Sequence, residues 1–301
     1  MSGRLFVHIG PPKTGSTALQ MALQNIDKDD FGYLGVRQPR SANDRTLSAL
    51  LDDYCSGREP VLGSDLKTEL TTVRDRVANG ETLVLSEELF LVWEPEADIW
   101  AKLDRLDQML SDIERTYVAT LRDPIQALPS YFQELYAHLS MRERGRPAEF
   151  FEHPRCDCYD YEKLTAWFED RDLELRYIGI EHLARGTAHL RQLLGASCKI
   201  DAELTIPSVN SGTKSSSGEM RVLQPTRLTD LTKTGLQRRL VDKLKTTSPR
   251  LHSAIRQWAR SVVLKPESSQ TLEVPAARAE QLQCAYRRVR ERAMVLSAPS
   301  P

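Results

Sequence analysis

The chain has 301 residues, and its 41 basic and 42 acidic residues give a formal net charge of -1. Nucleic-acid-binding proteins carry a basic patch or excess, so this balance gives no reason to expect one. The first apolar run is too short for a signal peptide and no run approaches the roughly 20 residues that span a bilayer, so we expect a cytoplasmic protein with no transmembrane segment. Five irregularly spaced cysteines indicate reduced thiols rather than a disulfide framework.

The first predicted element is an apolar strand from residue 4 that leads into a glycine-bounded loop and a helix. Residues 10–17 read Gly-Pro-Pro-Lys-Thr-Gly-Ser-Thr. Such a turn at a helix start directs several backbone N–H groups to one point, where the helix dipole favours an anion. The glycines have Walker A spacing, but Lys13 lies inside the loop and Ser16 stands where that motif has lysine. The pattern predicts a phosphate site, with an ordinary strand-to-helix turn as the alternative.

His8 lies in the first strand, and we interpret it as a packed strand residue or a wall of the loop rather than a catalyst. A further buried strand is predicted within residues 81–90, and it ends in Glu87 and Glu88. Open α/β sheets place their chemistry at the carboxyl ends of strands. A catalytic base and a Walker B carboxylate are the two functional interpretations, and they differ in metal dependence. A solvated turn residue is the alternative, which we favour for Glu88.

Residues 116–121 predict another buried strand, and helix-start chemistry follows it directly. Arg122 closes the strand, Asp123 suits the N-cap, and Pro124 suits the first helical position. Ser130 follows a turn or two into the helix, so that a guanidinium and a hydroxyl can meet one phosphate. An Arg-Asp pair at a surface helix start is the alternative.

Together, Pro-Lys-Thr-Gly-Ser-Thr and Arg-Asp-Pro followed by Ser resemble the 5′-phosphosulfate loop and the 3′-phosphate motif of sulfotransferases. These enzymes use 3′-phosphoadenosine-5′-phosphosulfate (PAPS) as donor. The resemblance extends from residue 4 to about residue 218. It implies metal-independent transfer of a sulfuryl group to a hydroxyl or amine of a small molecule or glycan, and we favour a glycan or glycolipid. Pro129 departs from the pattern, because it should bend the helix or delay its start and so change the aim of Ser130.

The resemblance also implies roles for individual residues. Lys13 would stabilise the leaving phosphate, and Glu87 would be the base, with Glu88 as the fallback. A polar loop at residues 207–218 would contribute a lysine that closes over the nucleotide. The implied donor site consists of Lys13, Thr14, Gly15, Ser16, Thr17, Arg122, Ser130 and Lys214.

The segments beyond Ser130 support the fold more than the chemistry. Residues 159–168 predict a helix that leads into a strand at 173–178, and its apolar positions three and four apart form a core stripe of Tyr161, Leu164, Trp167 and Phe168. The charged run at 142–146 is interpreted as a solvated loop, with part of a lid as the alternative. No fourth ligand completes a zinc site beside His153, Cys156 and Cys158, so we expect no metal there.

Alternating strand and helix patterns from residue 4 to about 195 predict an α/β fold, with a P-loop-NTPase-like, mainly parallel sheet flanked by helices. We expect one PAPS-binding domain over residues 1–218. Residues 219–296 contain no convincing strand and predict a helical extension packed on this domain, and 297–301 predict a frayed tail.

Two other classes of protein remain open on the sequence. One is a P-loop kinase or NTPase that uses ATP and magnesium and places its lysine unusually. The other is a sulfotransferase relative that binds PAPS without catalysing transfer. No feature of the sequence indicates an oligomeric state.

Overall fold

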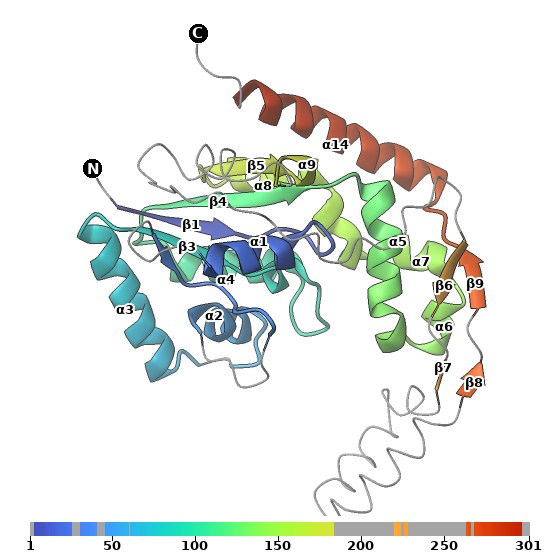
Figure 1. Cartoon of the computed structure of the whole chain (residues 1–301), viewed down its shortest axis with the longest axis horizontal. Coiled ribbons are helices and arrows are strands. Elements are labelled where there is room, and N and C mark those ends of the chain that lie inside the picture. Colours follow the sequence, from blue (N-terminus) through green and yellow to red (C-terminus); the bar gives the residue numbers. More distant parts are fainter. Residues whose placement is uncertain are drawn as a thin grey trace, which may run out of the picture. The chain divides into compact units, whose positions relative to one another are not determined.

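A computed structural model gives the fold (Figure 1). The residues that it describes are 3–25, 31–40, 46–59, 61–183, 220–223, 226–227, 263–265 and 268–296. The chain divides into two compact units. The first comprises Met1–Ala127, Pro154–Gly212 and Glu280–Pro301, and the second comprises Leu128–His153 and Thr213–Ala279.

The first unit contains a five-stranded sheet with the order β2-β3-β1-β4-β5, in which every pairing is parallel. Figure 1 shows β3, β1, β4 and β5 side by side in that order. The register places His8 at the end of β1 opposite Ser86 of β3 and Val118 of β4. The strands are β1 (Arg4–His8), β2 (Gly32–Tyr33), β3 (Thr82–Ser86), β4 (Arg115–Leu121) and β5 (Leu175–Gly179).

Strand residues of the central sheet are buried in continuous runs, such as Leu83, Val84 and Leu85 in β3. Continuous apolar runs are typical of parallel strands with both faces covered. Parallel strands need crossover connections, which helices provide here. The α/β, P-loop-like fold expected from the sequence is therefore confirmed. The helices of this unit are α1 (Ser16–Gln24), α2 (Leu47–Cys55), α3 (Ser64–Ala78), η1 (Leu89–Leu91), α4 (Ile99–Met109), η3 (Pro154–Tyr159), α8 (Tyr161–Glu169) and α9 (Ile180–Leu183).

Helix α8 buries the predicted stripe of Tyr161, Leu164, Trp167 and Phe168. It begins at Tyr161, two residues later than predicted, because the Asp160 side chain caps it by accepting the Lys163 N–H at 3.3 Å.

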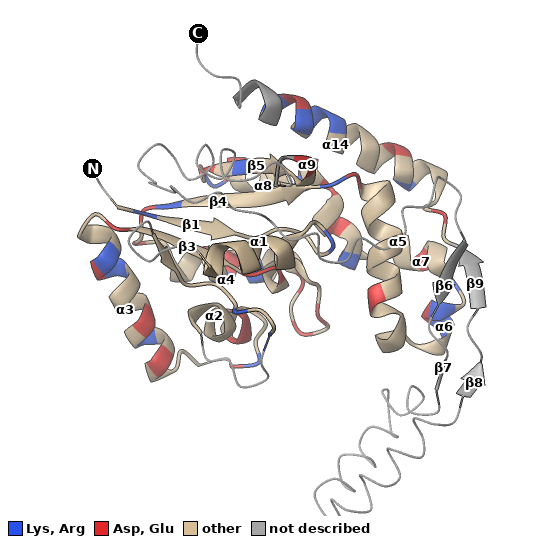
Figure 2. Ribbon diagram, viewed as in Figure 1, with Lys and Arg blue, Asp and Glu red and all other residues tan. Residues whose placement is uncertain are grey.

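Helix α14 (Ala276–Leu296) provides the expected C-terminal helix, and its residues from Glu280 onward belong to the first unit. It buries an apolar stripe that includes Leu282, Ala285 and Val289. Figure 2 shows basic residues along its C-terminal half. Three of these form ion pairs within the unit. Arg288 and Arg292 pair with Glu162 and Glu169 of α8, and Arg290 pairs with Glu181 of α9.

Helix α5 (Pro124–Leu135) contains residues of both units. The Asp123 carboxylate accepts the Ile125 N–H at 2.9 Å, which makes it the expected cap. The predicted delay of the helix start is wrong, because the helix begins at Pro124 and includes Pro129.

The second unit has an aromatic core. It contains the remainder of α5, η2 (Tyr136–His138), α6 (Met141–Arg144) and α7 (Pro147–Glu152), and its packed rings are Tyr131, Phe132, Tyr136, Phe150 and Phe151. The charged run at 142–146 was predicted to be a solvated loop. This prediction is wrong for Arg144, which is buried at the end of α6. Its guanidinium donates to the carbonyls of Ala137 and Leu139 and lies over the Tyr136 ring, so the residue is only 4% exposed.

The expected absence of strands in residues 219–296 is corrected by short antiparallel pairs in the second unit. Strand β6 (Met220–Leu223) pairs with β9 (Ser268–Thr271), and β7 (Thr226–Arg227) pairs with β8 (Val263–Lys265). Strands of two to four residues are too short to show a convincing alternation of polar and apolar side chains. No helix among the described residues is long and apolar enough to cross a membrane.

Candidate functional site

The loop at residues 10–15 follows the carboxyl end of β1 and leads directly into α1. Lys13 and Gly15 have positive φ angles of 61° and 91°, so the chain turns through two left-handed residues. Gly15 is the N-cap of α1, and no side-chain cap hydrogen bond is formed there among the residues that the structure describes. A backbone of this kind forms a concave site for an anion at the positive end of the helix.

Three consecutive loop carbonyls are held by hydrogen-bond donors. The Thr14 hydroxyl donates to the Pro11 carbonyl at 2.6 Å, the Tyr159 hydroxyl to the Pro12 carbonyl at 2.6 Å, and Arg122 Nη1 to the Lys13 carbonyl at 2.5 Å. The C=O and N–H of one planar peptide unit point in opposite directions. The N–H groups of Lys13 and Thr14 therefore point away from the Tyr159 and Arg122 side chains.

Gly10 is required by close packing where the loop begins. A Cβ atom at this position would lie 2.3 Å from Thr120 Oγ1 and 2.7 Å from His8 Nε2. Thr120 also shares a hydrogen bond with the Thr14 hydroxyl, so the end of β4 and the loop are packed together. The first glycine of the motif thus has a steric role that the sequence could not show.

The His8 side chain packs against Gly10 at the start of the loop, and the residue is 2% exposed. Its Nδ1 is 2.8 Å from Ser86 Oγ, and its backbone carbonyl accepts the Glu87 N–H at 3.0 Å. Burial lowers the pKa of His8 to about 4, so the ring is neutral at neutral pH. Within the described part of the chain, His8 Nε2 and Ser16 Oγ are buried without a hydrogen-bond partner. Such groups call for a partner such as a water or a ligand.

Arg122 lies at the end of β4, as predicted, and the structure brings it to the loop through its bond to the Lys13 carbonyl. Its guanidinium lies at the edge of the loop, and the planar fork of an arginine suits the oxygens of a phosphate. Its backbone is fixed by Tyr161, whose hydroxyl bonds the Arg122 N–H and carbonyl at 3.1 and 3.0 Å. Ser130 lies in α5 within the second unit.

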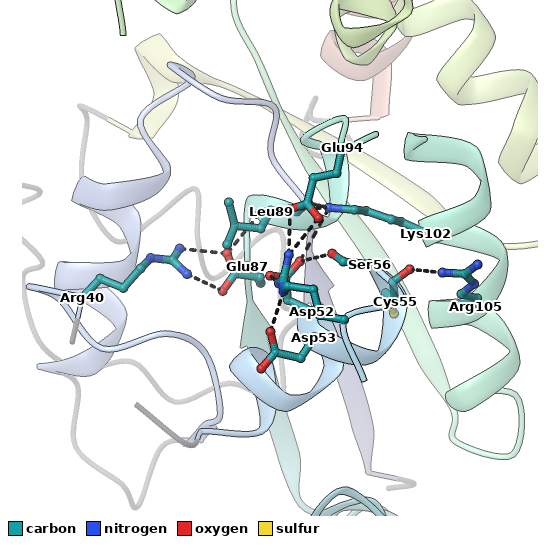
Figure 3. A network of polar contacts seen from close by, with 11 residues as sticks. Arg40, Asp52, Asp53, Cys55, Ser56, Glu87, Leu89, Glu94, Lys102 and Arg105 are labelled. Carbon is teal, nitrogen blue, oxygen red and sulfur yellow. Dashed lines mark hydrogen bonds and ion pairs between the residues drawn. The ribbon is translucent and has the colours of Figure 1, made fainter. Parts of the chain in front are cut away.

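Glu87 follows β3 at the same edge of the sheet, and its side chain is completely buried. Arg40 binds its carboxylate with two parallel hydrogen bonds of 2.8 and 3.0 Å (Figure 3). The Leu89 N–H donates a third bond to Glu87 Oε1 at 3.0 Å. Burial raises the pKa of Glu87, and the bonds from Arg40 and Leu89 oppose that rise.

A partly buried ionic cluster lies beside Glu87, and Figure 3 shows it. The ammonium group of Lys102, which has no exposed surface, donates to the Leu89 carbonyl at 3.1 Å and lies 3.4 Å from Glu94. Arg58 bonds Asp52, Asp53 and Glu94. Burial is the main cause of a raised pKa at Asp52. The interactions of this cluster connect α2, η1 and α4 beside Glu87.

The structure therefore brings together three of the predicted regions: the loop with Thr14, Gly15, Ser16 and Thr17, the arginine after β4, and the carboxylate after β3. Lys214, the polar loop at 207–218 and the tail at 297–301 lie outside the described residues. Sequence reasoning missed Arg40, Tyr159 and Thr120. Arg40 lies in an irregular segment and Tyr159 ends the short helix η3, and neither belongs to a recognisable motif. Thr120 is the buried penultimate residue of the predicted strand β4.

In comparisons with known proteins, no family model matches the chain, and no curated protein matches it either. No group of three or more His, Cys, Asp or Glu side chains within the described ranges is arranged to hold a metal ion. The chemistry of the site therefore has to be argued from its own groups. These are a loop whose backbone geometry suits an anion, an arginine at its edge, and a buried carboxylate that follows the adjacent strand.

Proposed function

We propose that the protein is a PAPS-dependent sulfotransferase. The observation that carries this proposal is the bond from Arg122 to the Lys13 carbonyl, because it joins two phosphate-binding motifs that lie 109 residues apart. A loop of this kind alone suits any phosphate. A second, forked cation beside it suits a nucleotide with phosphate at two positions.

In this proposal the 5′-phosphosulfate binds the backbone N–H groups of residues 14–17. No side chain within the described ranges caps the N-terminus of α1, which supports a role for these donors in binding an anion. Ser16 Oγ, buried without a partner in the described residues, offers one more donor. Arg122 holds the 3′-phosphate, and the roles that the sequence resemblance implies for Ser130 and Lys214 stay predictions.

The transfer step follows from these positions. The acceptor oxygen or nitrogen attacks the sulfur in line, and its bond to sulfur forms as the bond between sulfur and the bridging phosphate oxygen breaks. Glu87 receives the acceptor proton, and 3′-phosphoadenosine-5′-phosphate leaves with the bond electrons. Lys13 offsets the negative charge that develops on the leaving phosphate. The acceptor is a hydroxyl or amine, with a glycan or glycolipid favoured, and the proposed location is the cytoplasm.

A second candidate is a PAPS-binding relative that does not catalyse transfer. The double hydrogen bond from Arg40 to Glu87 favours it, because a base bound in this way is not ready to accept a proton. The two candidates predict the same nucleotide binding and differ only in turnover.

Calorimetric titration tests the donor site. We expect 3′-phosphoadenosine-5′-phosphate to bind more tightly than ADP or ATP and to bind equally with and without magnesium. Arg122→Lys is the matched variant, because it keeps the positive charge and removes the fork, and it should weaken binding of the 3′-phosphorylated nucleotide more than of ADP. Preference for ATP with magnesium would replace the proposal with a kinase or NTPase.

A further inference from the structure

The Arg40–Glu87 pair joins a half-buried cation to a fully buried carboxylate. The Arg40 side chain is 34% exposed, whereas that of Glu87 is 0% exposed. Arg40 therefore lies between Glu87 and solvent on the side from which its two hydrogen bonds come (Figure 3).

The hydrogen bonds occupy most of the accepting capacity of Glu87. Its Oε1 accepts from Arg40 Nη2 and from the Leu89 N–H, and its Oε2 accepts from Arg40 Nη1. A carboxylate oxygen has two lone pairs, so Oε1 is saturated and one lone pair of Oε2 is left. The adjacent guanidinium also favours the ionised form of the carboxylate, so transfer of a proton to Glu87 becomes more favourable when the guanidinium moves.

The chain just before Arg40 is held by hydrogen bonds to a helix of the same unit. Two residues earlier, the Gln38 N–H donates to Gln24 Oε1 at 2.9 Å and Gln38 Nε2 donates to Gln20 Oε1 at 2.7 Å. Both acceptors lie on α1, the helix that follows the anion-binding loop. The segment that carries Arg40 is thus attached to that helix two residues before Arg40.

Opening the pair leaves the guanidinium without its carboxylate and leaves the buried carboxylate with only the Leu89 N–H as a partner. A buried carboxylate that loses its cation is strongly destabilised, so Arg40 does not simply swing away. The exchange becomes favourable when one molecule supplies both replacements, an oxyanion for the guanidinium and an O–H or N–H for the carboxylate.

We propose that Arg40 covers Glu87 and is released by an acceptor that carries an oxyanion, such as a sulfate or carboxylate group, close to the hydroxyl or amine that reacts. Arg40 binds the oxyanion, and Glu87 then accepts the proton. The transfer step in this proposal rests on the proposed function, whereas the cover and its release by an oxyanion do not. The acceptor class is therefore anionic.

Carbodiimide labelling of Glu87 with glycine ethyl ester, located by peptide mass spectrometry, tests the cover. Wild-type Glu87 should label slowly, and Arg40→Gln should raise the rate about tenfold or more, as expected when a charge-assisted pair is lost. The matched control is Arg58→Gln, which removes an arginine of the neighbouring cluster that does not contact Glu87. Arg40→Lys provides a second variant if Arg40→Gln does not fold, and it should label faster than wild type. Equal rates in wild type and a folded Arg40 variant would overturn the proposal.

The same labelling on the wild-type protein tests the oxyanion. Glucose 6-sulfate should accelerate labelling of Glu87, whereas glucose with sodium chloride at the same ionic strength should not. A third arm uses inorganic sulfate, and 3′-phosphoadenosine-5′-phosphate is present throughout to fill the loop. Acceleration by inorganic sulfate at the same concentration as the sugar sulfate would show that any free anion suffices and would overturn the acceptor role. No acceleration by either anion would overturn the release. Because labelling does not depend on turnover, it separates this proposal from failure of the nucleotide titration.

Discussion

The loop after β1 and the carboxylate after β3 lie at the same edge of one sheet, but they are organised in opposite ways. In the loop, neutral and charged donors hold the carbonyls of Pro11, Pro12 and Lys13, and the helix start remains uncapped. At Glu87, nearly every accepting site is filled by Arg40 and Leu89. We therefore expect the first region to bind an anion directly, and the second to exchange a partner before it accepts a proton. The comparison separates donor binding from proton transfer, and the following variants test each part.

Glu87→Gln tests the carboxylate after β3 and should have the largest effect on turnover. It should lower turnover by about 100-fold to 10,000-fold, because an amide cannot take the acceptor proton, while nucleotide affinity stays at the wild-type value. Turnover of PAPS and calorimetry measure the two effects. Glu88→Gln is the control, and if it loses turnover in place of Glu87→Gln, the base is one residue further along the chain.

Lys13→Ala tests the loop after β1. Loss of one charge that stabilises a transition state costs about 100-fold to 1,000-fold in rate. The loop should stay folded, since Tyr159 and Arg122 bind its backbone carbonyls. Turnover assays, with circular dichroism for the fold, should compare this variant with Lys67→Ala, which removes an exposed lysine of α3. Wild-type turnover in Lys13→Ala would mean that the chemistry assigned to the loop is wrong.

Gly10→Ala tests whether the loop is held as tightly as its hydrogen bonds indicate. The added methyl group would meet Thr120 and His8 within 2.7 Å, and overpacking of this kind costs about 3 kcal/mol at the upper end of its usual range. Urea unfolding measures the loss. Gly63→Ala is the control, since the nearest atom to its added methyl group is 4.0 Å away, and the idea fails if both variants are equally stable.

Arg122→Ala should weaken 3′-phosphoadenosine-5′-phosphate by about 10-fold to 100-fold, the usual effect of losing hydrogen bonds to a charged group. Calorimetry should show a smaller loss for ADP, which has no 3′-phosphate. An equal loss for both nucleotides would indicate that Arg122 supports the loop through the Lys13 carbonyl and does not contact the 3′-phosphate.

The sequence could predict what depends on local patterns. The strand ends, the loop and the cap at Asp123 follow from residues close together in the chain, and the parallel sheet then brings Lys13 and Arg122 to one edge. Arg40 could not be found in this way, because its partner lies 47 residues away and its own segment has no periodicity. The short strands between Met220 and Thr271 were missed for a related reason. Each has at most four residues, and its pairing depends on a distant partner.

The pH dependence due to His8 is the smallest predicted effect. It tests the packing of His8 against the start of the loop at residues 10–15. Its pKa is about 4 in the folded protein against 6.5 for an ordinary histidine, so below pH 6.5 the unfolded chain binds more protons than the folded one. Stability should therefore fall as the pH drops from 6.5 towards 4, by about 2 kcal/mol at pH 5, since one pKa unit corresponds to 1.36 kcal/mol.

Urea unfolding across this pH range should compare wild type with His8→Asn. The raised pKa values of Glu87 and Asp52 act in the opposite direction, but they are present in both proteins and cancel in the difference. His138→Asn, at an exposed position of η2, should follow the wild-type curve. If wild type and His8→Asn lose stability in parallel, His8 is not the buried, neutral support of the loop, and the partner of its Nε2 must be a group that accepts its proton.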